Sequence, residues 1–336
     1  MIVWTKAEGC RVTLADGREM LDLTGGFGVA ALGHRNPRII AAWQEQHVVH
    51  ALGDLADAEV TQRLRAALPW PAKLGVTGED AVEIALRTAA LATKRNGIVA
   101  FDGAYHGTGL LALAATDFPQ FKEAWRDWLP GPVHRYPYGG DPGPLPDDTA
   151  CVIVEPVQGR AGSRVPPAGF LAQLRARCDD AGALLVVDSI YAGLGRIGEL
   201  WPGADVADIV CVGKALGGGI PLSAALFARE ELEQLWRLGP EDGYTHTHVG
   251  NPHAGAAALV VLEEVPSLLD RVHELGERFE RAGWHGKGLL RAKAGSADDA
   301  LARGVLVVPA GDGGLIQATP PFTLTDEELD EALSRT

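Results

Sequence analysis

The runs ALLVVD at residues 183–188 and ADIVCVGK at residues 207–214 decide the fold of this chain. Each is a short stretch rich in Leu, Ile or Val that closes on a charged residue, Asp188 or Lys214. Apolar runs of this kind are typical of strands that are covered on both faces. Similar runs occur at 97–101, 150–156 and 222–228, and helical spacing of apolar residues occurs over 79–95 and 168–182. This alternation predicts an α/β fold with a mostly parallel sheet flanked by helices.

The ends of the predicted strands carry polar side chains. Tyr105 and His106 follow the strand at 97–101, and Glu155 follows the apolar part of the next run. Asp188 and Lys214 end the two runs quoted above. Ligands of open α/β sheets bind beyond the carboxyl ends of the strands. We therefore expect a carboxylate and a lysine to meet in one pocket.

Lys214 stands out among the basic residues. The chain has seven lysines against 23 arginines, and Lys214 ends an apolar strand and leads into three glycines. Burial lowers the pKa of a lysine and makes its neutral amine available as a nucleophile, as Schiff-base chemistry requires. The alternative is a structural lysine that pairs with Asp188.

Three other features allow both a structural and a functional interpretation. Asp188 either caps the following turn or pairs with the pyridinium nitrogen of a cofactor. Tyr105 is either a half-buried aromatic residue or a ring that stacks on that cofactor. The segment 75–79 ends an apolar stretch and opens a helix, a geometry that suits phosphate, although its glycine and threonine are weak signals on their own.

Composition excludes several classes of protein. The chain has 336 residues, and with 30 Lys and Arg against 44 Asp and Glu its net charge is −14, which argues against nucleic-acid binding. No apolar run reaches the roughly 18 residues of a membrane span. The four cysteines show no metal-ligand spacing, and two of them, Cys151 and Cys211, lie in apolar runs, which indicates burial. We expect a cytoplasmic protein with buried thiols and no metal.

Ordered motifs along nearly the whole chain are similar to those of the class III pyridoxal-phosphate (PLP) aminotransferases, the group of the ω-transaminases and 4-aminobutyrate aminotransferases. They are the segment from Asp22 to Pro37, the run Ala104-Tyr105-His106-Gly107, the run from Glu155 to Gly159, the spacing from Asp188 to Lys214, the run from Thr247 to Pro252, and Pro320-Pro321-Phe322. The resemblance implies PLP-dependent transferase fold type I with a reduced α/β small domain. It implies a large domain at 40–255 and a small domain formed by 1–39 and 256–336.

The resemblance also implies a role for each matching residue. Lys214 would be the Schiff-base lysine and proton shuttle, and Asp188 would hold the pyridine nitrogen. Ile190 and Tyr105 would pack on the two ring faces, with Gln158 at the phenolic oxygen. The remaining residues implied for the cofactor are His106, Glu155, Thr77, Gly78, Glu79 and, from a neighbouring subunit, Thr247. That last contact implies a homodimer with shared active sites.

Two departures from the family pattern concern charge. Arg160 stands where the family has an acidic or small residue, and Gln317 stands where many members have a carboxylate-binding arginine. We expect Arg160, Gln317 and Phe27 at the substrate, although Arg160 could instead point to solvent. Glu79 lies beside the expected phosphate site, where a carboxylate would be repelled. We expect it to turn outward at the start of its helix.

The chain is also short for this family. Gly286-Lys287-Gly288 leads within about twenty residues to Gly304, so a helical excursion is expected to be trimmed and the entrance to the site more open. The predicted activity is transfer of an amino group from an amine or ω-amino acid to a keto acid such as pyruvate. An aminomutase resembling glutamate-1-semialdehyde aminomutase, and a catalytically idle PLP-fold binding protein, remain as alternatives.

Overall fold

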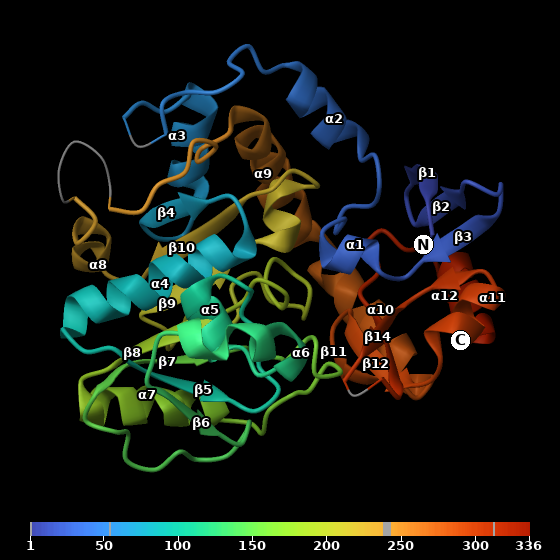
Figure 1. The fold of residues 1–336 in the computed structure, drawn as a ribbon. Coiled ribbons are helices and arrows are strands. Elements are labelled where there is room, and N and C mark those ends of the chain that lie inside the picture. The colour runs from blue at the N-terminus through green and yellow to red at the C-terminus, as the bar shows by residue number, and fades with distance from the viewer. Residues whose placement is uncertain (1, 54, 238–242, 312) are drawn as a thin grey trace.

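A computed structural model describes residues 2–53, 55–237, 243–311 and 313–336. Its largest element is a seven-stranded sheet in the order β4-β10-β9-β8-β7-β5-β6 (Figure 1). The strands are β4 (Ala72–Gly75), β5 (Gly97–Phe101), β6 (Val133–Tyr136), β7 (Thr149–Val154), β8 (Leu184–Asp188), β9 (Ile209–Val212) and β10 (Ser223–Phe227). Neighbours from β6 to β9 are parallel, whereas β10 is antiparallel to both β9 and β4. The predicted mostly parallel sheet is confirmed.

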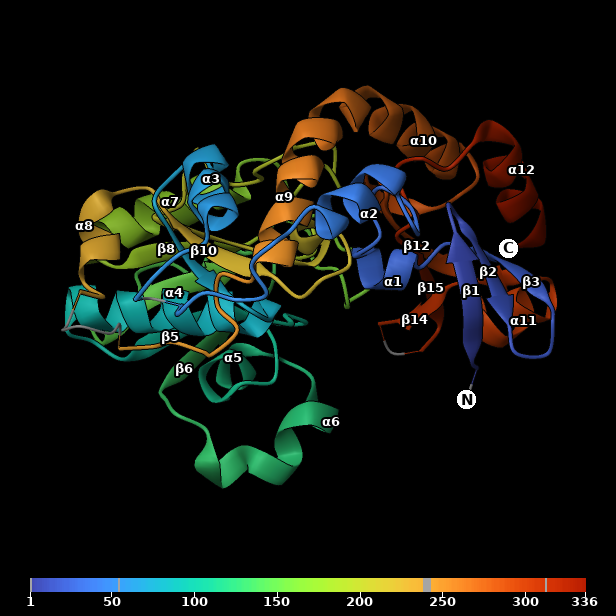
Figure 2. The same cartoon turned by 90° about the horizontal axis from the view of Figure 1, so that it is seen from above.

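Helices cover both faces of this sheet because its strands are apolar on both. Alternate residues of β8 join different clusters: Val186 packs with α4 (Gly78–Thr93), and Leu185 and Val187 pack in the cluster that contains α7 (Phe170–Ala181). Figure 2 shows α4 and α7 on opposite sides of the strands. The other helices of this region are α2 (Pro37–Gln44), α3 (Glu59–Ala67), α5 (Leu110–Ala115), α6 (Pro119–Lys122), η1 (Glu123–Trp128), η2 (Lys214–Gly217), α8 (Glu230–Gln234) and α9 (Pro252–Glu264).

Two four-stranded sheets form the second part of the molecule. The first has the order β1-β2-β3-β13 and the second β11-β12-β15-β14. Their strands are β1 (Trp4–Glu8), β2 (Arg11–Leu14), β3 (Glu19–Asp22), β11 (His285–Lys287), β12 (Leu290–Ala294), β13 (Val305–Leu306), β14 (Val308–Ala310) and β15 (Leu315–Ala318). The helices here are α1 (Gly25–Gly28), η3 (Val265–Leu268), α10 (Leu269–Arg281), α11 (Ala297–Ala302) and α12 (Asp326–Arg335). Both ends of the chain lie in this part (Figure 1).

The small sheets combine distant parts of the sequence. Parallel pairing of Val305 and Leu306 with Leu21 and Asp22 joins the C-terminal segment to the N-terminal hairpin. Between Gly288 and Gly304 the chain forms only β12 and the six-residue α11. The sequence predicted a shortened connection here, and the connection is short.

Three general expectations can be compared with the described residues. All four cysteines are buried and free, as predicted for Cys151 and Cys211. Within the described ranges, no helix combines the length and apolar character needed to cross a membrane. No group of three or more potential metal ligands gathers in that part of the chain.

Candidate active site

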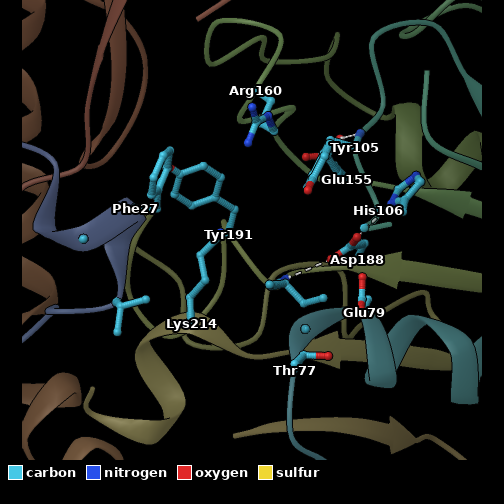
Figure 3. A pocket seen from close by; sticks show the side chains of 15 residues that line it. Phe27, Thr77, Glu79, Tyr105, His106, Glu155, Arg160, Asp188, Tyr191 and Lys214 are labelled. Carbon is cyan, nitrogen blue, oxygen red and sulfur yellow. Dashed lines mark hydrogen bonds and ion pairs between the residues drawn. The ribbon is translucent and has the colours of Figure 1, made fainter. Parts of the chain in front are cut away.

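A cavity of about 530 Å³ lies beyond the carboxyl ends of β7, β8 and β9 (Figure 3). Residues at or just after the ends of β7, β8 and β9 line it. Its wall is completed by α1, the start of α4 and the segment after β5. Of the residues predicted for the site, Gln158, Thr247 and Gln317 do not line the cavity. Its lining is Gly26, Phe27, Val29, Thr77, Gly78, Glu79, Tyr105, His106, Gly107, Glu155, Arg160, Asp188, Ile190, Tyr191 and Lys214.

Lys214 occupies a strained position just after β9. Its φ of 39° lies in the left-handed region, which costs a non-glycine residue roughly 1–3 kcal/mol. Burial lowers the pKa of its amine to about 8, a shift that Asp188 opposes and Arg160 reinforces. The amine lies 4.2 Å from the centroid of the Tyr191 ring. Among the described residues it makes no ion pair with Asp188, so the structural alternative of a Lys214–Asp188 pair is not what the structure shows.

Asp188 is held firmly at the end of β8. Its Oδ2 lies 2.7 Å from Nδ1 of His106, and its Oδ1 accepts a hydrogen bond of 3.1 Å from the backbone N–H of Ile190. The backbone N–H of His106 donates in turn to the hydroxyl of Thr116. Both Asp188 and His106 are buried. These contacts fix one carboxylate toward the cavity, and its histidine partner is buried at the cavity wall.

Glu155 supplies a second buried carboxyl group at the same wall. It accepts hydrogen bonds from the backbone N–H groups of Tyr105, at 3.1 Å, and Gly159, at 3.3 Å. Burial raises the pKa of Glu155 to about 8, and the neighbouring Asp188 adds to this shift. Glu155 therefore anchors the two loops that carry Tyr105 and Arg160.

The start of α4 gives the cavity a set of backbone N–H groups. Asp80 organises this turn by accepting hydrogen bonds from the N–H groups of Val76 and Thr77, at 2.9 and 2.8 Å. Asp80 was missed in the sequence analysis, although the pattern Thr77-x-x-Asp80 is a capping-box signal. Glu79 turns to the neighbouring loop, where its Oε2 accepts from the N–H groups of Thr108 and Gly109. The carboxylate is thus directed at this loop, but Glu79 still lines the cavity, so the expected outward turn is only partial.

Arg160 lies on an aromatic platform at the cavity. The centre of its guanidinium group is 4.6 Å from the Tyr105 ring centroid, 5.3 Å from that of Phe121 and 6.0 Å from that of Phe118. No hydrogen bond or ion pair of this guanidinium group is formed within the described part of the chain. Its charge is thus positioned by ring faces while its N–H donors stay available to a ligand.

Two predicted positions need correction. Gln158 donates its amide to the carbonyl of Asp102 at 2.9 Å, so the side chain points to that turn instead of the cavity. Gln317 donates to the carbonyl of Gly159 and to Ser163, and it accepts a hydrogen bond of 3.1 Å from the Tyr191 hydroxyl. It therefore lies behind Tyr191, which lines the cavity and which the sequence analysis did not include.

Thr247 lies in a separate hollow of about 420 Å³. Leu52, Leu55 and His50 line the same hollow. Within one chain, Thr247 makes no contribution to the cavity at Lys214.

Comparisons with known proteins show the family of the chain. The family described as aminotransferase class III matches residues 1–282. The chain is 36% identical to acetylornithine aminotransferase of Methanopyrus kandleri, over 97% of this chain and 91% of the relative. It is 33% identical to 4-aminobutyrate aminotransferase of Escherichia coli, over 82% of this chain and 71% of that relative.

Solved structures show the same fold. Ornithine aminotransferase of Toxoplasma gondii superimposes with a TM-score of 0.90 at 26% identity, covering 99% of this chain and 89% of that one. A PLP-bound amine transaminase from an uncultivated Pseudomonas species superimposes with a TM-score of 0.87 at 26% identity, covering 100% and 93%. These neighbours have the PLP-dependent transferase fold of type I, which was the predicted fold.

The residues of the cavity fit PLP. Asp188 offers an anion for a pyridinium nitrogen, and the amine of Lys214 has a lowered pKa. A Cβ at Gly78 would lie 3.0 Å from Ile190, the residue expected on one ring face, so the glycine lets the start of α4 approach Ile190 closely. A larger residue at 78 would close the space between α4 and Ile190.

Proposed function

The chain belongs to the class III aminotransferases and is a PLP-dependent aminotransferase, and from that premise we propose that it transfers an amino group from an amine or ω-amino acid to a monocarboxylic keto acid such as pyruvate. The observation that carries this proposal is Arg160, a cation at the cavity without an ion pair among the described residues, together with the neutral Gln317 behind Tyr191. The relatives named for acetylornithine and 4-aminobutyrate support a substrate with a terminal amino group.

Each side chain of the cavity would have its own role in amino transfer. PLP, when bound, withdraws electrons from the carbon that carries the amino group. Lys214 would hold the cofactor covalently and move the proton, because a pKa of about 8 leaves part of its population as the neutral amine at neutral pH. Asp188 would keep the ring nitrogen protonated, and His106 keeps Asp188 in place. Thr77 and Gly78 would hold the phosphate through the N-terminus of α4.

Arg160 favours a substrate with one carboxylate. A guanidinium group binds a carboxylate through two parallel hydrogen bonds, which an amide cannot match in charge. Gln317 is neutral, and its amide is occupied by Gly159 and Ser163. Dicarboxylates such as 2-oxoglutarate and glutamate would bring a second negative charge. Among the described lining residues the Lys and Arg side chains are Arg160 and Lys214, and Lys214 would be attached to the cofactor. We therefore expect them to be poor substrates.

The test compares Arg160→Ala with the control Arg164→Ala. Arg164 also lies over a tyrosine ring, at 5.4 Å from the Tyr138 centroid, but it does not line the cavity. Loss of a charged hydrogen bond of about 1.5–3 kcal/mol should raise the KM for pyruvate roughly 10- to 150-fold in Arg160→Ala. Aldehyde acceptors and simple amine donors should be little affected, and Arg164→Ala should behave as wild type.

Three results would overturn this assignment. Equal effects of Arg160→Ala on acidic and neutral acceptors would make Arg160 a structural residue. Rapid use of 2-oxoglutarate by the wild type would contradict the proposed substrate class. Rearrangement of one amino compound without any keto-acid acceptor would identify an aminomutase instead.

We also propose a cytoplasmic homodimer with a large domain at 40–255 and a small domain at 1–39 and 256–336. The buried free thiols support a reducing compartment. The position of Thr247 in a hollow outside its own cavity supports a contact with a second subunit.

A further inference from the structure

The free amine of Lys214 rests on an aromatic ring. Its Nζ lies 4.2 Å from the centroid of Tyr191, and in the described part of the chain it makes no hydrogen bond or ion pair (Figure 3). A ring face attracts an ammonium group because the π electrons give it negative electrostatic potential. Tyr191 thus supplies the ring face that the amine contacts.

The Tyr191 ring is fixed from several sides. Its hydroxyl donates to Gln317 at 3.1 Å and lies 3.5 Å from the hydroxyl of Thr319. A Cβ added to Gly28 would meet the ring at 3.1 Å, and one added to Gly159 would overlap the opposite edge of the ring. The ring therefore sits in a slot between two glycines, with its hydroxyl tethered to the C-terminal sheet.

We propose that Tyr191 is a positioning residue that holds the amine of Lys214 against the cavity wall whenever this amine is not attached to the cofactor. If Lys214 holds the cofactor covalently, its amine would be free while the amino group of a substrate is being transferred. A fixed position on the Tyr191 ring keeps the amine close to the cofactor site and restricts the conformations of the Lys214 side chain. This proposal rests on the function proposed above for Lys214.

The pKa of the Lys214 amine tests whether Tyr191 positions it. The charged groups that face Lys214 are Asp188 and Glu155, which favour the ammonium form, and Arg160 and Arg196, which oppose it. A ring face also favours the ammonium form, so removing the ring should lower the pKa of Lys214 further. The hydroxyl of Tyr191 is directed at Gln317, so removing it alone should leave the pKa nearly unchanged.

The experiment measures the rate at which cyanate carbamylates Lys214 in the full chain freed of cofactor, from pH 6 to 10, with the modified peptide quantified by mass spectrometry. Tyr191→Leu should lower the pKa of Lys214 by about half to one and a half units. Tyr191→Phe should keep the wild-type value. The matched control is Phe322→Leu, because Phe322 places its ring 4.6 Å from the guanidinium of Arg196 and does not line the cavity.

Thermal melting of each variant separates positioning from folding. If Tyr191→Leu does not fold, Tyr191→Met replaces it, because methionine fills a similar space without a π face.

In the PLP-loaded enzyme, loss of the ring should lower kcat for the amine donor at least about tenfold, with the KM of that donor little changed. An unchanged Lys214 pKa in a folded variant without the ring, or an equal shift in Phe322→Leu, overturns the proposal. A shifted pKa in an enzyme that does not transfer amino groups would refute the proposed function and leave the positioning intact.

Discussion

At the scale of single residues, Lys214 combines a strained backbone, burial and a contact between its amine and the Tyr191 ring. Its left-handed backbone, its lowered pKa and its place on the Tyr191 ring all separate it from an ordinary lysine. Strained non-glycine residues persist where the surrounding structure holds them, and they cluster at functional sites.

Replacing this lysine should abolish amino transfer without unfolding the protein. Lys214→Ala removes the covalent attachment and the proton carrier, so single-turnover transfer should fall by several orders of magnitude. Lys287→Ala is the control, because Lys287 forms an exposed ion pair with Glu199 and lies outside the cavity. Stopped-flow absorbance of the bound cofactor and a thermal melt measure both properties. Turnover near the wild-type level in Lys214→Ala would contradict the assignment.

Glu155 should make stability depend on pH. Burial raises its pKa to about 8, so the folded chain binds a proton that the unfolded chain, with a glutamate pKa of about 4.3, releases. The stability linked to this proton is fully present below the unfolded pKa and is lost as pH rises through the folded pKa.

We therefore expect Glu155→Gln to gain stability relative to wild type as pH rises from about 5 to 8, by about 1.4 kcal/mol for each unit of pKa shift. Urea unfolding of the cofactor-free protein at several pH values measures the difference. Parallel curves for the two proteins across this range would show that Glu155 keeps an ordinary pKa.

Sequence patterns located the strand-end residues of the cavity but not the direction of every side chain. Asp188 and Lys214 follow apolar strands, and the topology of a parallel sheet alone brings such ends together. Gln158 and Gln317 are different, because their directions depend on acceptors far along the chain, Asp102 and Gly159. Tyr191 gave no sequence signal, since its contact with Lys214 exists only in the folded chain.

At the scale of elements, the N-terminus of α4 lines the cavity where the phosphate of PLP is expected to bind. Asp80 closes its first turn through Val76 and Thr77, and its other oxygen accepts from the hydroxyl of Tyr244. Burial acts to raise the pKa of Asp80, but these hydrogen bonds outweigh it and the net shift is downward.

Loss of this carboxylate should loosen the turn and weaken PLP binding. We expect Asp80→Ala to lower the free energy of unfolding by about 1–3 kcal/mol, because buried N–H groups lose their acceptor. Asp80→Asn is the matched control, since its amide oxygen can still accept. Because the folded pKa is depressed, the stability due to Asp80 should be present above about pH 4 and lost as pH falls through the folded value. Equal unfolding energies for wild type and Asp80→Ala would disprove the capping role.

The helices and strands were predictable to different degrees. The run 97–101 became β5 with the same bounds, and the pattern over 79–95 became α4 with its start at Gly78. β6 was missed because its sequence, VHRY, is an edge strand of partly exposed residues without an apolar run. Its place in the sheet comes from parallel pairing with β5.

At the scale of the whole molecule, one buried arginine joins parts that are distant in sequence. Arg196 donates to the carbonyls of Leu289 and Pro320 at 3.2 and 2.5 Å, and to that of Gly28 at 3.5 Å. These carbonyls belong to the β11–β12 hairpin, the C-terminal segment and α1, which carries Phe27. The cavity wall thus depends on contacts between the first and last parts of the chain, which no local sequence pattern encodes.

A second subunit should complete the molecule. An apolar surface formed by Val48, Val49, Leu52 and Leu55 has side chains that are 45–82% exposed, and two of these leucines line the hollow that holds Thr247. Neighbouring exposed apolar residues are typical of interaction surfaces. We expect Val49→Asp combined with Leu52→Asp to convert a dimer into monomers, because association would bury charge. Val165→Asp changes a valine that is 48% exposed elsewhere and serves as the control.

Assembly and activity should then change together. If Thr247 contributes to the partner's site, dilution of the wild type should lower PLP occupancy and turnover in parallel, because a partner that binds only the folded, assembled state stabilises it by mass action. The double variant should show low occupancy at concentrations where the wild type and Val165→Asp are saturated. Sedimentation equilibrium combined with cofactor absorbance measures both quantities on one sample. A monomer that keeps its cofactor and full turnover would show that each chain carries a complete site.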